Sequence, residues 1–225
     1  MATQRSVDQL IEHGVFEQTA DDRLTLAQSF IEAVERHRDR LEAADVDEIE
    51  TAVAKVTIDE ETAVRLCENA SYDPSVLSRV IALREIDESA TLGQTLLLAV
   101  VTDQLATGIP PDEGAPEGFV PVFGAGLKTL VSTCERCLVY VWREECKPCE
   151  TVSKALSELV AGGGGTAAVP LAVYGPDDVS VLRRNYDVVG APTVFSTVDG
   201  CVDTAIAGPA SKSKLTAELR ALGES

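Results

Sequence analysis

The sequence has few basic residues and few aromatic ones. Lys and Arg together number 19 against 37 Asp and Glu, which gives a formal net charge of -18, and only 4% of the residues are aromatic. Nucleic acids and anionic membrane surfaces attract proteins through clustered positive charge, so this balance argues against binding to either. Only 6 of the basic residues are lysines. A surface this acidic and this poor in lysine is what we expect of a halophilic protein, because high salt screens the self-repulsion, and an ordinary acidic cytosolic protein is the alternative.

Long apolar runs are also missing. The longest, Leu96 to Val101, is far shorter than the roughly 20 residues that a transmembrane helix needs. Residues 1–13 are polar and charged, without the basic-then-apolar pattern of a secretory signal. We therefore expect a cytoplasmic protein that is not inserted in a membrane.

Histidine is scarce, whereas cysteine is not. His13 and His37 are the only histidines and have no carboxylate partners at ligand spacing, so we expect solvated or helix-capping side chains. In a reducing cytosol, the paired members of the 6 cysteines are more often catalytic or metal-binding than structural disulfides. Cys67 and Cys201 stand alone, and we expect each to be a small buried hydrophobic side chain.

Residues 1–108 have the apolar spacing of helices throughout and predict an all-α domain. Asp59 and Asp73 are suited to N-cap positions, and Pro74 to a first helical position. The final helix is the most apolar, so we expect it to be the central one. The predicted helices are a short one after a capping box at Ser6 and Gln9, then 24–44, 46–56, 60–69, 74–84 and 90–107.

Residues 109–118 contain three prolines and two glycines, which neither a helix nor a central strand accommodates. We interpret this segment as a stiff linker and expect a second domain over 119–225.

In the second domain, β-branched runs alternate with amphipathic segments. Asp199-Gly200 is a strong signal for a type I′ hairpin. Strands alternating with helices predict an α/β fold. We predict strands at 119–123, 138–142, 168–174, 193–198 and 201–207, a glycine-rich loop at 162–165, and helices at 127–133, from 149, at 178–186 and near the C-terminus.

A strand–turn–helix unit with a Cys-x-x-Cys motif is the main chemical feature. The β-branched and aromatic run from Leu138 to Trp142 precedes Cys146 and Cys149, and Pro148 falls in the first turn of the predicted helix. A thiol at a helix N-terminus faces unpaired amides and the positive end of the helix dipole, which favour the thiolate. We therefore expect an exposed, nucleophilic Cys146 and a more buried Cys149 that resolves the mixed disulfide.

This unit, followed about forty residues later by Gly190-Ala191-Pro192-Thr193-Val194-Phe195, resembles the thioredoxin family. The resemblance covers roughly the last half of the chain and implies a thioredoxin-like fold there, a central mixed β-sheet flanked by helices. It also implies that Pro192 is a cis-proline and that Ala191 offers backbone groups to an extended substrate. Gly190 would allow close approach, and Trp142 would be the strand-end aromatic of the substrate site.

Two positions depart from the family pattern. Glu145 stands where thioredoxins usually carry tryptophan, and Tyr140 where they usually carry a buried aspartate that helps move protons to the second thiol. Lys147 adds a cation that lowers the pKa of the pair, whereas Glu145 and its acidic neighbours oppose this effect. These departures favour a specialised thiol oxidoreductase with an acidic rim.

A second Cys-x-x-Cys, Cys134 and Cys137, ends nine residues before Cys146, so a four-cysteine zinc site has to be weighed. If 138–142 is extended, Cys137 and Cys146 lie about 25–30 Å apart. Zn–S bonds of about 2.3 Å cannot gather both pairs over that distance. Redox chemistry is therefore favoured over zinc. For Cys134 and Cys137, an auxiliary disulfide, a metal or dimer contact and plain packing all stay open.

The sequence thus predicts a cytoplasmic thiol–disulfide oxidoreductase acting on protein or small-molecule disulfides. Its only redox group would be the Cys146–Cys149 disulfide, with no further cofactor and no metal. The resemblance implies a disulfide-containing protein substrate and a cytosolic reductant such as a thioredoxin reductase. Two alternatives stay open. One is an adaptor with little turnover, motivated by Tyr140 and Glu145, and the other is a zinc protein using all four paired cysteines.

Overall fold

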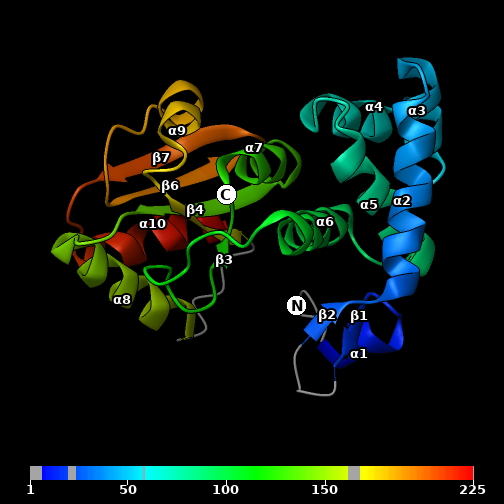
Figure 1. Ribbon diagram of the computed structural model, residues 1–225. Coiled ribbons are helices and arrows are strands. Elements are labelled where there is room, and N and C mark those ends of the chain that lie inside the picture. The colour runs from blue at the N-terminus through cyan, green and yellow to red at the C-terminus, as the bar shows by residue number, and fades with distance from the viewer. Residues whose placement is uncertain (1–6, 20–23, 58, 162–167, 225) are drawn as a thin grey trace. The chain divides into compact units, whose positions relative to one another are not determined.

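The computed structural model describes residues 7–19, 24–57, 59–161 and 168–224 (Figure 1). The chain divides into two compact units, Met1–Gly108 and Ile109–Ser225. Two of the sequence-based expectations lie outside the described residues. These are the helix cap at Ser6 and the glycine-rich loop at 162–165.

The first unit is mainly helical, and its helices begin where the sequence places their caps. The Asp59 carboxylate accepts a hydrogen bond from the Thr62 amide at 2.7 Å, and Asp73 accepts one from the Ser75 amide at 2.9 Å. Each satisfies an amide that the first helical turn leaves unpaired. The described helices are α1 (Val7–Glu12), α2 (Gln28–Glu42), α3 (Val46–Ala54), α4 (Glu60–Asn69), α5 (Pro74–Ile86) and α6 (Leu92–Thr107).

A two-stranded antiparallel ribbon, β1 (Phe16–Gln18) and β2 (Leu24–Leu26), corrects the expectation of helix over the whole unit. The helix expected from residue 24 therefore begins at Gln28. The helix starts later because Leu24 is 47% exposed, so it is not one of the apolar residues that the helix buries. Ala27 instead bonds back to the Val15 carbonyl at 3.0 Å, which fixes the ribbon beside the start of α2.

Helix α5, rather than α6, is the central helix of this unit. All seven residues from Leu77 to Leu83 are buried, and α5 packs against α2, α3 and α6. In α6, by contrast, Leu105 is 45% exposed. The apolar content of α6 predicted the wrong centre because burial depends on how many neighbours surround a helix, and α5 has neighbours on several sides.

Two charged side chains of the first unit make contacts between helices. Arg79 is only 5% exposed. Its guanidinium donates to the Ser75 carbonyl at 2.8 Å and lies 3.2 Å from the Asp103 carboxylate. His37 is not the solvated side chain expected, because its Nε2 lies 3.0 Å from the Glu85 carboxylate. These contacts join α5 to α6 and α2 to α5, respectively.

The second unit is a five-stranded mixed sheet in the order β3-β5-β4-β6-β7, as the sequence predicts for the α/β class. Strands β3 and β4 are parallel to β5, whereas β6 is antiparallel to β4 and β7. Asp199 and Gly200 have φ values of 48° and 81°, as the predicted type I′ turn requires. The elements are β3 (Val120–Pro121), α7 (Gly124–Thr133), β4 (Arg136–Trp142), α8 (Lys147–Ala161), β5 (Val169–Tyr174), α9 (Val179–Tyr186), β6 (Thr193–Val198), β7 (Cys201–Ala207) and α10 (Lys212–Glu224).

Helices cover both faces of this sheet, α8 and α10 on one and α7 and α9 on the other (Figure 1). Successive side chains of β4 alternate between the two faces. Leu138, Tyr140 and Trp142 therefore lie in one core cluster with Leu156 of α8 and Leu215 of α10. The strand is buried along nearly its whole length, which is why its sequence is an apolar run rather than an alternation.

The proline-rich segment 109–118 belongs to the second unit and packs onto it. Gly114 lies so close to the Trp142 ring that a Cβ there would clash with it. The Glu117 amide donates to Ser157 Oγ of α8 at 2.9 Å, and the adjoining Phe119 is only 7% exposed. No helix in the described part of the chain is long and apolar enough to cross a membrane.

We expect a fragment of residues 109–225 to fold alone and to unfold cooperatively, because it carries its own sheet and core. A matched fragment of 119–225 exposes the Trp142 ring and loses the Glu117 hydrogen bond, so it should be about 1–3 kcal/mol less stable. Urea unfolding followed by far-UV circular dichroism measures both. Equal midpoints would mean that 109–118 is a linker with no structural role.

Candidate active site

Cys146 and Cys149 form a disulfide at the junction between β4 and α8. The S–S distance is 2.02 Å and the Cα atoms are 5.1 Å apart. Helix α8 begins at Lys147, so Cys146 immediately precedes it and Pro148 lies in its first turn. The sequence pattern predicted this placement, since the β-branched run of β4 ends just before the motif and the apolar helical spacing begins just after it.

The backbone amides of α8 converge on Cys146. The Cys149 amide donates to the Cys146 sulfur at 3.2 Å, and the Glu150 amide donates to the Cys146 carbonyl at 3.1 Å. Cys146 therefore occupies the capping position of the helix, where the helix dipole is most positive. After reduction, the same amide would stabilise a thiolate at Cys146, which is the nucleophilic form of cysteine.

The disulfide is more enclosed than the sequence predicts. Cys146 was expected to stand clear of the helix, yet it is 5% exposed and Cys149 is 4% exposed. Both belong to the core cluster formed by β4, α8 and α10. Because α8 docks against the sheet over its first turns, its N-terminus is drawn into the core, and both sulfurs are buried with it.

A pocket of about 410 Å³ opens at the disulfide and has an acidic rim. Glu145, which directly precedes Cys146, has a φ of 50°, an uncommon conformation for a residue with a side chain. It is exposed, as is Lys147 on the other side of Cys146. Four carboxylates line the pocket against two cations, and these residues are Glu113, Glu144, Glu145, Glu150, Arg143 and Lys154.

Tyr140 lies beside the Cys146–Cys149 pair, at the position where the thioredoxin pattern has aspartate. Its side chain is fully buried, and its hydroxyl donates to the Cys149 carbonyl at 2.8 Å. Burial raises the pKa of Tyr140, so the hydroxyl stays a neutral donor under ordinary conditions. Tyr140 therefore positions the backbone of the second cysteine, a contact that the family pattern did not indicate.

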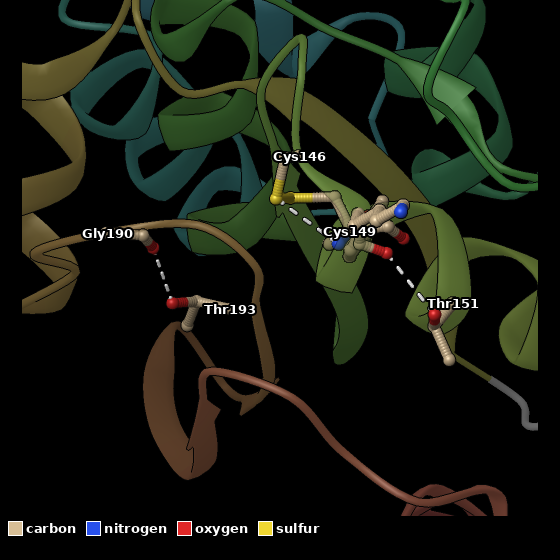
Figure 2. Close-up of a disulfide and its surroundings, with 7 residues drawn as sticks. Cys146, Cys149, Thr151, Gly190 and Thr193 are labelled. Carbon is tan, nitrogen blue, oxygen red and sulfur yellow. Dashed lines mark hydrogen bonds between the residues drawn. A yellow bond between two sulfur atoms is a disulfide. The ribbon is translucent and has the colours of Figure 1, made fainter.

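The segment from Gly190 to Thr193 lies next to the end of β4. The Ala191–Pro192 peptide bond is cis, and Pro192 is buried with its carbonyl accepting from the Gly208 amide at 2.8 Å. Thr193 donates to the Gly190 carbonyl at 2.7 Å, which closes the turn shown in Figure 2. Ala191 packs against the core cluster that contains Cys146 and Cys149. Gly190 is exposed.

Trp142 is placed at the end of β4 but is almost wholly buried, at 2% exposed. Its ring lies 4.9 Å from that of Tyr174 at an angle of 54°, and it lines the pocket beside the disulfide. Any contact of Trp142 with a substrate would therefore be made through that pocket rather than from an exposed surface.

A second pocket of about 400 Å³ adjoins the Gly190–Ala191 segment, and sequence reasoning did not identify it. Its exposed apolar side chains are Val179, 57% exposed, and Val189, 77% exposed. Arg143 and Arg183 also line it. Two exposed valines near the ends of a predicted helix were a weak signal, because a single exposed apolar residue is ordinary on a protein surface.

The other cysteines are separate from this site. Cys134 and Cys137 are reduced and buried near the start of β4, whereas Cys146 follows the end of that strand. The structure thus does not bring the two pairs together, and no ligating group of three or more His, Cys, Asp or Glu occurs among the described residues. Cys67 is buried as expected, but Cys201 is exposed because it follows the hairpin turn on the edge strand β7.

The mixed sheet, the Cys-x-x-Cys disulfide at the start of α8 and the cis-proline before β6 define a thioredoxin-like fold for the second unit. This fold covers about half of the chain, and the first unit supplies additional helices.

Solved structures similar to this chain include a mutant thioredoxin from Halobacterium salinarum NRC-1, 19% identical, over 49% of this chain and 96% of that one (TM-score 0.41). A Malassezia sympodialis thioredoxin is 17% identical over 48% and 95% of the two chains (TM-score 0.43). A Plasmodium falciparum thioredoxin is 20% identical over 45% and 96% (TM-score 0.40). No protein-family model and no curated protein matches the chain.

Replacing Tyr140 with phenylalanine should destabilise the protein by about 1–3 kcal/mol, because the Cys149 carbonyl loses its buried donor. The Cys146–Cys149 disulfide should still form. Urea unfolding of the oxidised protein measures the change. Tyr174→Phe is the matched control, since the Tyr174 hydroxyl bonds to no described residue, and it should change stability little. If the two variants were equally stable, the Tyr140 hydrogen bond would have no energetic role.

Proposed function

We propose that the second unit is a thiol–disulfide oxidoreductase in which Cys146 is the nucleophile and Cys149 the resolving cysteine. The observation that carries the proposal is the hydrogen bond from the Cys149 amide to the Cys146 sulfur at the N-terminus of α8. The two sulfurs are also within bonding distance of each other, as the closed disulfide requires. Such a pair can accept or deliver two electrons.

The reaction begins with the reduced pair. The Cys146 thiolate attacks one sulfur of a substrate disulfide, forming a mixed disulfide and expelling the first substrate thiolate, which takes up a proton. Cys149 then loses its proton and attacks the Cys146 sulfur, which releases the second substrate thiolate and closes the Cys146–Cys149 disulfide. The substrate is reduced by two electrons, and a dithiol reductant such as a cytosolic thioredoxin reductase restores the pair. No other cofactor takes part.

Substrate recognition would involve the surface on the Gly190–Pro192 side of the pair. The Ala191 backbone next to Pro192 would bind an extended segment, and Gly190 would allow it to approach closely. The adjoining pocket offers Val179 and Val189 to an apolar side chain. These features favour a protein disulfide as substrate, with Lys147 and the acidic rim adjusting the reactivity of the pair.

The proposal also includes the salt concentration and the cellular compartment in which the protein works. Carboxylates outnumber basic residues and give the chain a net charge of -18, which favours the interpretation that it is a halophilic protein working at high salt. The cytoplasm is the compartment we infer, since a reducing environment is where a cysteine pair of this kind turns over.

An adaptor with little turnover is a second candidate, and the enclosure of the pair favours it. With Cys146 only 5% exposed, a protein disulfide must approach through the 410 Å³ pocket or move the surrounding loop. An adaptor would bind a partner through the same surface without reducing it. Reduction of insulin by dithiothreitol separates the two, because an adaptor does not exceed the uncatalysed rate.

Cys149→Ser should trap a covalent mixed disulfide at Cys146, because no second thiol remains to release the substrate. Turnover in the insulin assay should fall to background. Mass spectrometry after incubation with a disulfide-bonded protein identifies the adduct and its site. The control is Cys146→Ser, which leaves Cys149 without the attacking thiol and should give no adduct. Equal labelling of both variants would contradict the assigned roles.

Val179→Asp combined with Val189→Asp should raise KM for a protein disulfide about fivefold to tenfold, since about 1–1.4 kcal/mol of apolar burial is lost. The rate with a small disulfide should not change, because that substrate does not reach the pocket. Steady-state kinetics with insulin and with oxidised glutathione compare the two. Val202→Asp is the control, as Val202 is 40% exposed and does not line this pocket. An equal effect of both changes would mean that only surface charge matters.

A further inference from the structure

Residues 112–117, which the sequence suggested were part of a linker, form one wall of the pocket at the disulfide. We call these residues the strap. Glu113 and Gly114 line the pocket together with the Cys146–Cys149 pair. The next residue, Ala115, packs against the core cluster that contains both cysteines. The strap is therefore a part of the candidate site as well as of the segment that connects the two units.

Gly114 lies against the six-membered ring of Trp142 with no room for a side chain. A Cβ atom at Gly114 would lie 2.6 Å from both Cδ2 and Cζ3 of that ring, closer than real Cβ atoms approach. The ring has little room to move, because Trp142 is only 2% exposed and packs against Tyr174 at a centroid distance of 4.9 Å. Glycine is therefore the residue that allows the strap to occupy this position.

A second contact ties the strap to α8. The Glu117 amide donates to Ser157 Oγ at 2.9 Å, and that hydroxyl in turn donates to the Ser153 carbonyl at 2.9 Å. Pro116, between the two contacts, is buried. Trp142 is the last residue of β4, and Ser157 lies on α8. The strap is thus attached to the two elements between which the disulfide lies.

We propose that the strap determines substrate specificity at the Cys146–Cys149 pair, with Gly114 as its key residue. The strap admits a disulfide carried on a narrow, extended segment and excludes the disulfide of a compact folded protein. This inference rests on the proposed oxidoreductase function. It is supported by the enclosure of the two cysteines, which are 5% and 4% exposed. The pocket that reaches them has a volume of about 410 Å³, a size typical of small-ligand sites.

A compact protein reaches the Cys146 sulfur only when the strap is displaced, because Glu113 and Gly114 form a wall of the pocket. Displacement breaks the contact with Trp142 and the hydrogen bond of the Glu117 amide, and it leaves the sheet and α8 in place. The free energy of this opening sets how strongly compact substrates are excluded. A substitution that weakens either contact should therefore relax the exclusion.

Trp142 is the only tryptophan of the chain, so its fluorescence reports the position of the strap. In the full chain, Gly114→Ala and Ser157→Ala should each shift the emission to longer wavelength and increase its quenching by acrylamide, because water then reaches the ring. Thr216→Ala is the matched control. The Thr216 hydroxyl on α10 also donates to a helix carbonyl, that of Lys212, but it bonds to no strap residue. Its loss should leave the emission unchanged.

A second measurement compares the access of small and large reagents to Cys146. Each variant is combined with Cys149→Ser, reduced, and treated either with N-ethylmaleimide or with a maleimide attached to a long polymer. After unfolding and a second alkylation, peptide mapping gives the fraction of Cys146 that reacted. Ser157→Ala should raise the rate with the polymer reagent about fivefold, the effect of one lost hydrogen bond on an opening equilibrium, and leave the rate with the small reagent unchanged.

Turnover tests the substrate class directly. With Cys149 present, Ser157→Ala should raise kcat/KM for a compact folded protein with an accessible disulfide about fivefold. The same substitution should leave kcat/KM for a short disulfide-bonded peptide unchanged, because that substrate already enters the pocket. An equal rise for both substrates would overturn the assignment of specificity to the strap.

Unchanged access of the polymer reagent in both strap variants would also overturn the proposal, as would unchanged Trp142 emission. Far-UV circular dichroism checks that the variants fold, and if Gly114→Ala does not, Ser157→Ala gives the decision. The fluorescence and alkylation measurements need no turnover. If they show the expected changes while the insulin assay shows no catalysis, the proposed oxidoreductase function is rejected and control of access by the strap is not.

Discussion

The candidate site depends on one short contact, the 3.2 Å hydrogen bond from the Cys149 amide to the Cys146 sulfur. This contact exists only because a buried strand ends where a helix begins. Strand β4 is held by β5 on one side and β6 on the other, and α8 docks on it through fully buried side chains such as Leu156. The sheet thereby fixes the start of the helix, and the helix amides determine which sulfur accepts negative charge. Tyr140 adds a second constraint, because its hydroxyl donates a hydrogen bond to the Cys149 carbonyl and holds it in place.

The two-residue period of β4 gives this strand two chemically separate faces. Even-numbered side chains from Leu138 to Trp142 enter the layer of α8 and the disulfide, whereas Cys137 enters the layer of α7 and α9. The five strand residues 138–142, each rising about 3.3 Å, and the three residues 143–145 lie between the two cysteine pairs. Neither pair can exchange with the other in one molecule without unfolding the strand.

Local chemistry made part of this molecule predictable from its sequence. The hairpin at Asp199-Gly200 and the helix cap at Asp59 follow from residues a few positions apart, and both are confirmed. What depends on neighbours distant in the chain was not predictable. The apolar content of α6 gave the wrong central helix, because α5 is the one surrounded on several sides. The enclosure of Cys146 likewise comes from α8 docking on the sheet, which no local pattern records.

The two pockets differ in charge and in apolar surface. The pocket at the disulfide has four carboxylates, whereas the pocket beside Gly190 combines two arginines with exposed valines, and Arg143 lines both. In dilute buffer this difference would orient a charged substrate. At 1 M salt, however, the Debye length falls to about 3 Å, and charges on the two rims act only on groups in contact with them. Apolar burial is not screened in this way and is strengthened by salts that are excluded from protein surfaces. At high salt the exposed valines therefore remain the part of these pockets best able to hold an apolar group, whereas the charged rims lose most of their reach.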